Sequence, residues 1–209
     1  MKNATKHAEK LRSLLKSLLR DGKPAPLIPI DPLHALVRAA MLYDMPDARA
    51  DEAMRLIDRE FVDLNELRVA TELEVQELLG ARYDDIEQRV QLITRCLNAI
   101  FERENTLNLD RLRTVSRREA RQFLRDLPDM HPFVDGYVML FGFESPAVPV
   151  DRLMLEYLSD QGIADDTATL DELQRFLEHQ LKPEECYDFY ACVRREISGG
   201  AGRKRRAKA

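Results

Sequence analysis

Leucines near the N-terminus have the spacing of one helix face. Five of them recur at positions i, i+3, i+4, i+7 and i+8: Leu11, Leu14, Leu15, Leu18 and Leu19. This period of about 3.6 residues predicts an amphipathic helix. Gly22, Pro24 and Pro26 follow and end the pattern, because glycine and proline terminate helices.

Helix starts can be placed from capping residues. Asp31 precedes Pro32, an arrangement that predicts an N-cap followed by proline at the first helical position. Thr71 with Glu74, and Ser116 with Glu119, have the spacing of capping boxes. Gly80 is expected to end the helix that Thr71 begins.

Apolar periodicity continues through the rest of the chain. A long helix is expected over about 84–103, with its inner face formed by Ile86, Val90, Ile93, Leu97 and Ile100. Further helices are predicted at about 132–142, 152–160, 170–180 and 183–197. No segment alternates like a strand, so the sequence predicts an all-α protein with nearly ten helices.

Charge is distributed unevenly along the chain. The net charge is −5, but residues 1–24 and residues 199–209 each carry about +5, which leaves about −15 on residues 25–198. An acidic body is unfavourable for binding nucleic acid, because affinity depends largely on neutralising phosphates. The basic segment 199–209 is expected to be a disordered, solvated tail, or else a flexible arm for nucleic acid or a protein partner.

Composition favours an intracellular protein. With 44% hydrophobic residues, the 209-residue chain can bury a substantial core. Three irregularly spaced cysteines (Cys96, Cys186 and Cys192) and the absence of a signal peptide indicate free thiols in a reducing cytoplasm. No apolar run approaches the roughly 20 residues of a membrane span.

From about Asp31 to Ile197 the chain resembles the helix-hairpin-helix (HhH-GPD) DNA glycosylases of the endonuclease III type. Leu127-Pro128 and Val150-Asp151 stand at the separation that this family has between its hairpin and its catalytic aspartate, with the apolar "GYVMLFGF" between them. The segments "DPLHALVRAAML" and "LLGARYDDIEQRVQLITRCLNAI" are similar to two upstream helical segments of the family.

The resemblance implies a division into two helical lobes. We expect residues 1–30 and 145–198 to form one lobe and residues 31–144 to form the other, which ends in a degenerate hairpin. A cleft near Asp151 is expected between the lobes. Double-stranded DNA is the implied partner, and the protein would be cytoplasmic, or nucleoid-associated if it binds DNA.

The hairpin departs from the family pattern. The DNA-binding candidates by resemblance are Pro128, Asp129, Met130 and His131. Two of these positions are glycines in the family, which let backbone N–H groups approach a phosphate. Here Asp129 adds negative charge, and Pro132 lacks an N–H. Phosphate binding is therefore expected to be weak, and retention of the turn for packing alone is the favoured reading.

The catalytic positions depart as well. Bifunctional relatives have a lysine at the position of Phe133, and its amine forms a Schiff base with the sugar. Phe133 excludes that chemistry. Asp151 matches the aspartate that stabilises the sugar cation in monofunctional relatives, but it is equally suited to cap the helix that follows. Arg152 and Leu153 replace the family's usual Thr-His.

Other family features are missing. Asp44 stands where many relatives carry a base-replacing Gln. The iron-sulfur cluster of many members needs four cysteines, whereas Cys186 and Cys192 are alone in that region, so no metal or other cofactor is expected. The sequence thus leaves two functions open: a monofunctional DNA glycosylase that uses Asp151, or a catalytically inactive protein that binds DNA or another protein.

Overall fold

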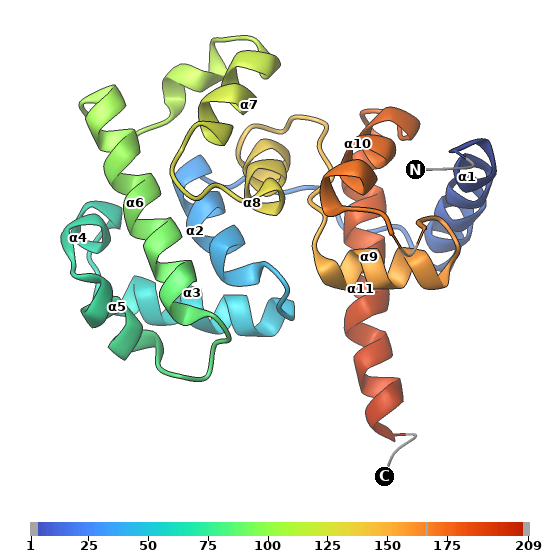
Figure 1. The fold of residues 1–209 in the computed structure, drawn as a ribbon, viewed down its shortest axis with the longest axis horizontal. Coiled ribbons are helices and arrows are strands. Elements are labelled where there is room, and N and C mark those ends of the chain that lie inside the picture. The colour runs from blue at the N-terminus through green and yellow to red at the C-terminus, as the bar shows by residue number, and fades with distance from the viewer. Residues whose placement is uncertain (1–3, 166, 207–209) are drawn as a thin grey trace. The chain divides into compact units, whose positions relative to one another are not determined.

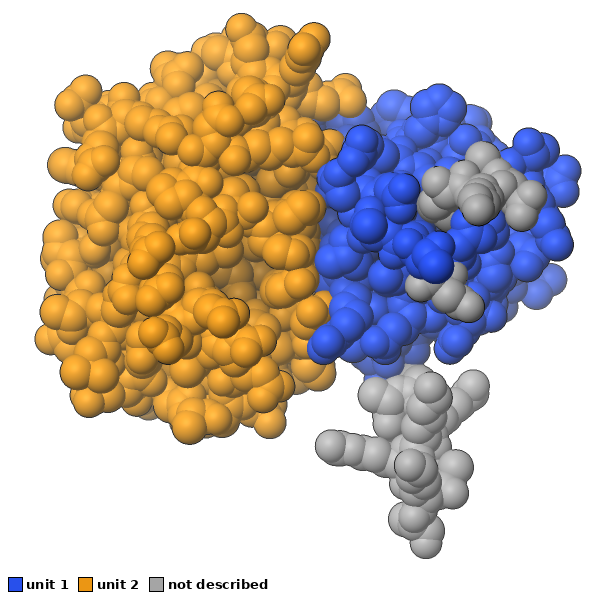
Figure 2. Space-filling view, in the orientation of Figure 1, with its two compact units in different colours: residues 1–28, 144–209 blue, residues 29–143 orange. Residues whose placement is uncertain are grey.

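A computed structural model describes residues 4–165 and 167–206, which form two compact units. Unit 1 combines the described residues up to Ile28 with those from Glu144 onward, and unit 2 comprises Pro29–Phe143 (Figure 2). The described residues contain helices and no strand (Figure 1). The predicted all-α class is therefore confirmed.

Unit 2 consists of seven α-helices and two short irregular helices. The α-helices are α2 (Pro32–Leu42), α3 (Asp47–Glu60), α4 (Leu64–Val69), α5 (Glu72–Leu79), α6 (Ile86–Glu104), α7 (Arg117–Arg125) and α8 (Pro132–Tyr137). A 3₁₀ turn, η1 (Asp110–Arg113), precedes α7. A π-helical turn, η2 (Val138–Gly142), continues α8.

The centre of unit 2 is α2, which packs against α3, α6, α8 and η2. Nine of its eleven residues are buried. Gly142 of η2 lies against this helix so closely that a Cβ atom there would be 2.9 Å from the Cα of Pro32. The hairpin that follows α7 is therefore attached, through α8 and η2, to the best-buried helix of the unit.

Unit 1 is built from the two ends of the chain. It contains α1 (Ala4–Asp21), α9 (Arg152–Asp160), α10 (Leu170–Gln180) and α11 (Glu185–Arg206). Helix α11 packs against both α1 and α9. The apolar face of α1 predicted from its leucines is buried at Leu11, Leu15 and Leu18.

The capping predictions are confirmed. The Asp31 carboxylate accepts the N–H groups of Leu33 and His34 at the start of α2. Both capping boxes are complete, at Thr71 with Glu74 and at Ser116 with Glu119. These contacts satisfy backbone donors that the first turn of a helix leaves without partners.

Two helices differ from the expectation. The helix expected over 132–142 changes from α to π geometry after Tyr137. Helix α11 continues to Arg206 and so includes most of the segment 199–209, for which the sequence favours a disordered tail; residues 207–209 lie outside the described residues. Along the described chain, no helix is both long and apolar enough to cross a membrane.

Candidate nucleic-acid interface

The turn between α7 and α8 has the backbone of a tight hairpin. Asp126 caps α7, and its N–H donates to the Gln122 carbonyl. The N–H of Met130 then donates weakly to the Leu127 carbonyl at 3.4 Å. Helix α8 begins two residues later, at Pro132, with His131 as its N-cap. Two short helices thus meet at a six-residue turn, as the resemblance predicts.

Asp129 occupies the position in this turn that most favours glycine. Its φ is 55°, in the left-handed region where residues with a Cβ are uncommon and Asp and Asn are tolerated best. The Asp129 carboxylate lies 3.0 Å from the guanidinium of Arg95, and both side chains are about half exposed (52% and 51%). Such a solvated pair contributes little stability, and Asp129 adds an exposed carboxylate to the tip of the hairpin.

Helix α6 holds the turn in place through two backbone carbonyls. The Cys96 thiol donates to the Pro128 carbonyl at 3.2 Å, and the Arg103 guanidinium donates to the Asp126 carbonyl at 2.6 Å. Burial raises the pKa of Cys96 to about 12, so the thiol keeps the proton that it donates. The conformation of the turn is therefore fixed from outside as well as by its own hydrogen bonds.

His131 contributes a cap and an aromatic contact. Its Nδ1 accepts the Phe133 N–H at 3.1 Å, which requires that this nitrogen carry no proton. The ring lies 3.9 Å from that of Tyr43, centroid to centroid. Burial lowers the pKa of His131; nearby Asp44 raises it and Arg89 lowers it further. A neutral His131 brings no positive charge to the hairpin.

Phe133, at the position of the lyase lysine, belongs to the core of unit 2. Its side chain is fully buried between the rings of Tyr43 and Tyr137, at centroid distances of 5.9 Å and 6.1 Å. Tyr137 in turn stacks on Phe141 at 4.2 Å. This row of aromatic rings is held by packing and contains no amine.

Asp151 is both a helix cap and half of a buried ion pair. Its Oδ1 accepts the Met154 N–H at 2.9 Å, which starts α9. Its Oδ2 lies 2.8 Å from Nη1 of Arg194 in α11. The side chain of Asp151 is 0% exposed and that of Arg194 only 6%. Each carboxylate oxygen is thus engaged within unit 1, and the adjacent guanidinium balances the negative charge.

Two features, one in each unit, were not anticipated from the sequence. One is Arg194, which stands 43 residues after Asp151 and carries no local signal. The other is Asp135, which is 1% exposed and bonded to Arg121 at 2.8 Å and to Arg125 at 2.6 Å. Burial raises the pKa of Asp135, and the two guanidinium groups oppose this. The four-residue spacing of the arginines was the available signal, because such residues share a helix face.

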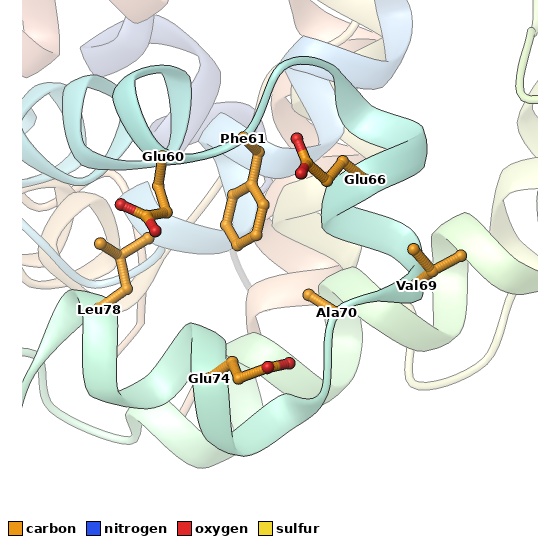
Figure 3. A pocket seen from close by; sticks show the side chains of 7 residues that line it. All are labelled: Glu60, Phe61, Glu66, Val69, Ala70, Glu74 and Leu78. Atoms are coloured by element: carbon orange, nitrogen blue, oxygen red, sulfur yellow. The ribbon is translucent and has the colours of Figure 1, made fainter.

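A hollow elsewhere in unit 2 is unsuited to DNA. It has a volume of about 280 Å³ and is lined by three glutamates (Glu60, Glu66 and Glu74) around Phe61, Val69, Ala70 and Leu78 (Figure 3). The carboxylates come from the end of α3, from α4 and from α5. Phosphates would be repelled from this surface.

The described residues offer no metal centre: nowhere among them do three His, Cys, Asp or Glu side chains gather to hold an ion. Cys186 and Cys192 are both buried, and neither forms a disulfide. Helix α9 begins with Arg152 and Leu153, directly after Asp151. The exposed guanidinium of Arg152 pairs loosely with Glu156 at 3.9 Å.

Comparison with solved structures finds DNA glycosylases. A non-covalent endonuclease III–DNA complex aligns with a TM-score of 0.72 and 14% identity, over 90% of this chain and 85% of the other. An 8-oxoguanine glycosylase/lyase from Clostridium acetobutylicum, bound to double-stranded DNA, gives 0.73 and 16%, over 95% and 71%. The 3-methyladenine DNA glycosylase of H. pylori, bound to 1,N6-ethenoadenine, gives 0.68 and 15%, over 93% and 98%.

No family model and no curated protein matches the sequence. The structural likeness nevertheless covers nearly the whole chain. The predicted fold, that of the helix-hairpin-helix DNA glycosylases, is therefore confirmed. At this level of identity the likeness establishes the fold and leaves activity to the residues of the site.

Proposed function

We propose that this protein acts on duplex DNA in base-excision repair, with at most monofunctional N-glycosylase activity at Asp151. The observation that carries the proposal is the retained hairpin backbone: Asp129 adopts the left-handed conformation of a glycine, and α6 clamps the carbonyls of Asp126 and Pro128. Aspartate tolerates this conformation better than most residues with a Cβ, so the turn has the tight backbone shape that a glycine would give it.

The residue at position 133 argues against Schiff-base lyase chemistry. A Schiff base needs a primary amine beside C1′ of the sugar. The buried phenyl ring of Phe133 offers none. Base release by water, in contrast, needs mainly a carboxylate that stabilises the sugar cation and helps to position the water. Asp151 is the residue that matches this role by its position before α9.

A second candidate, a catalytically inactive DNA-binding protein, is favoured by the ion pair at Asp151. A guanidinium 2.8 Å from Oδ2 balances the charge that would stabilise the sugar cation. With neither oxygen free and the side chain fully buried, Asp151 is arranged for stability. We therefore expect base release to be slow or absent even if DNA is bound.

Base release from defined duplexes tests the two candidates. The substrates each contain one uracil, 8-oxoguanine, 3-methyladenine or 1,N6-ethenoadenine, and alkaline cleavage reveals abasic sites. If Asp151 is catalytic, Asp151→Asn abolishes release while Asp160→Asn, an exposed control on the same helix, preserves it. Release that survives Asp151→Asn in a folded protein contradicts the role of Asp151.

Binding is measured in parallel, with a duplex that carries a tetrahydrofuran abasic-site analogue, between 50 and 200 mM salt. Salt-dependent binding without base release supports the inactive candidate. A salt slope of zero contradicts both candidates. Borohydride reduction on abasic DNA is expected to trap no covalent adduct, and an adduct would reveal a nucleophilic lysine elsewhere.

A further inference from the structure

Positive charge in unit 2 is concentrated near the hairpin. Residues 95–125 contain eight arginines and four acidic residues, whereas residues 58–87 contain ten acidic residues and three arginines. The acidic stretch covers the end of α3 and all of α4 and α5. Its residues line the hollow shown in Figure 3. The basic stretch includes the second half of α6 and all of α7, which leads into the hairpin (Figure 1). Unit 2 is thus electrically polar along its own sequence.

Helix α7 carries four arginines, and two of them have a structural role. Arg121 and Arg125 bind the two carboxylate oxygens of Asp135, which is 1% exposed. Removing either arginine would leave a buried charge with less compensation. These two residues fix α7 against α8.

The other two arginines, Arg117 and Arg118, have no structural partner. Both are exposed, and neither guanidinium makes an ion pair or hydrogen bond with any residue that the structure describes. The nearest acid in sequence, Glu119, is occupied by the capping box with Ser116.

Their position is also unfavourable for the stability of the helix. Arg117 and Arg118 lie in the first turn of α7, where the helix dipole disfavours positive charge. Arg117 is four residues before Arg121, and like charges at this spacing repel. Two unpaired cations at a position that disfavours cations are explained better by an external anion than by folding.

We propose that Arg117 and Arg118 bind backbone phosphates of duplex DNA next to the hairpin. The inference rests on the proposed function. Helix α7 has nine residues, so its first turn lies about 12 Å from the hairpin, a distance equal to roughly four base pairs of axial rise. Guanidinium groups match phosphate geometry with paired hydrogen bonds. This surface offsets the negative charge that Asp129 places on the hairpin.

The test compares two double variants that remove the same charge from unit 2. Arg117→Gln/Arg118→Gln alters α7. Arg55→Gln/Arg59→Gln alters α3, where both arginines are also exposed and make no ion pair or hydrogen bond with a described residue. Binding of a fluorescein-labelled 25-base-pair duplex to the full chain is followed by anisotropy between 50 and 200 mM salt. Thermal melting confirms folding, and the α7 variant should melt at or above the wild-type temperature.

Each lost phosphate contact should lower the salt slope by roughly 0.9, equivalent to an affinity loss of about eightfold at 0.1 M salt. The α7 variant is expected to lose one or two contacts, and the α3 control none. Equal losses in the two variants, or an unchanged slope in the α7 variant while wild type binds, would overturn this site and leave the proposed function standing. Failure of wild type to bind at all would overturn both.

Discussion

At the scale of single residues, the side chain that matters most is Asp151, because it serves two partners at once. One oxygen accepts the Met154 N–H and the other faces Arg194. Asparagine caps helices about as well as aspartate, so a cap alone would tolerate Asp151→Asn. The ion pair would not tolerate this substitution, because the asparagine amide would leave the buried Arg194 guanidinium without its counter-charge. Loss of activity in this variant must therefore be read together with its stability.

A double-mutant cycle measures this coupling. Arg194→Met should destabilise the protein by about 3–5 kcal/mol, because it leaves a buried carboxylate unpaired. Asp151→Asn should also destabilise it, whereas the double variant should lose clearly less than the sum. The free energy of unfolding is measured in urea. Arg152→Met, at an exposed position of α9, is the control and should change stability by no more than about 0.5 kcal/mol. Strict additivity would show that the pair is not formed.

His131 should make the hairpin sensitive to acid. Its pKa is lowered in the folded protein by burial, so its contribution to stability is present above the unfolded value of about 6.5 and is lost as pH falls through the folded value. Protonation of Nδ1 removes the acceptor for the Phe133 N–H. His131→Asn keeps a cap acceptor that does not titrate.

Between pH 7.5 and pH 5.0, wild type should therefore lose up to about 1 kcal/mol more stability than His131→Asn, the usual contribution of one N-cap. Urea denaturation at the two pH values provides the measurement. His179→Asn, at an exposed position on α10, should follow wild type. An identical acid response in wild type and His131→Asn would refute the role of Nδ1 as a cap.

At the scale of helices, the sequence predicted correctly the features that depend on contacts between residues close together in the chain. The caps at Asp31, Thr71 and Ser116 act within three residues, so the sequence is sufficient to place them. The ion pair between Asp151 and Arg194 joins residues far apart in the chain and depends on how α9 and α11 pack. The π turn after Tyr137 is also beyond local periodicity, and it lies where η2 packs against α2.

The close contact between η2 and α2 gives a direct test of this packing. Gly142→Ala places a Cβ 2.9 Å from the Cα of Pro32 and 3.1 Å from its Cβ, and backbone atoms of α2 cannot move aside cheaply. We expect a loss of about 1–3 kcal/mol. Gly199→Ala is the matched control, since a Cβ there meets nothing within 4 Å and lies in a helix.

The control should be neutral or stabilising by up to about 1 kcal/mol, the difference in helix propensity. Thermal and urea unfolding of both variants are compared with wild type. If Gly142→Ala proves as stable as wild type, the close approach of η2 to Pro32 is not present in solution.

At the scale of the whole molecule, the net charge of −5 does not show how positive and negative charges are distributed along the chain. Unit 2 carries 22 acidic and 15 basic residues, a net −7, yet its stretch 95–125 is positive by four. Electrostatic attraction to DNA therefore depends on how far repulsion from the acidic part is screened, over about 10 Å at 0.1 M salt. Charges beside the hairpin should therefore affect DNA affinity more than the net charge of the whole protein does.

Asp129→Asn tests this locality. The substitution keeps a side chain that tolerates the left-handed backbone, removes the negative charge from the hairpin tip and releases Arg95 from its pair. Removing one repulsion of about 1 kcal/mol at contact distance in water corresponds to roughly fivefold tighter binding.

The control Asp58→Asn makes the same change in total charge at an exposed site on α3, in the acidic stretch. It should alter affinity by less than about twofold, because exposed charges more than about 10 Å from a contact are largely screened at 0.1 M salt. Dissociation constants for the abasic-analogue duplex are compared at 0.1 M salt. Equal effects of the two substitutions would mean that only total charge acts, and the hairpin would then not be where this protein contacts DNA.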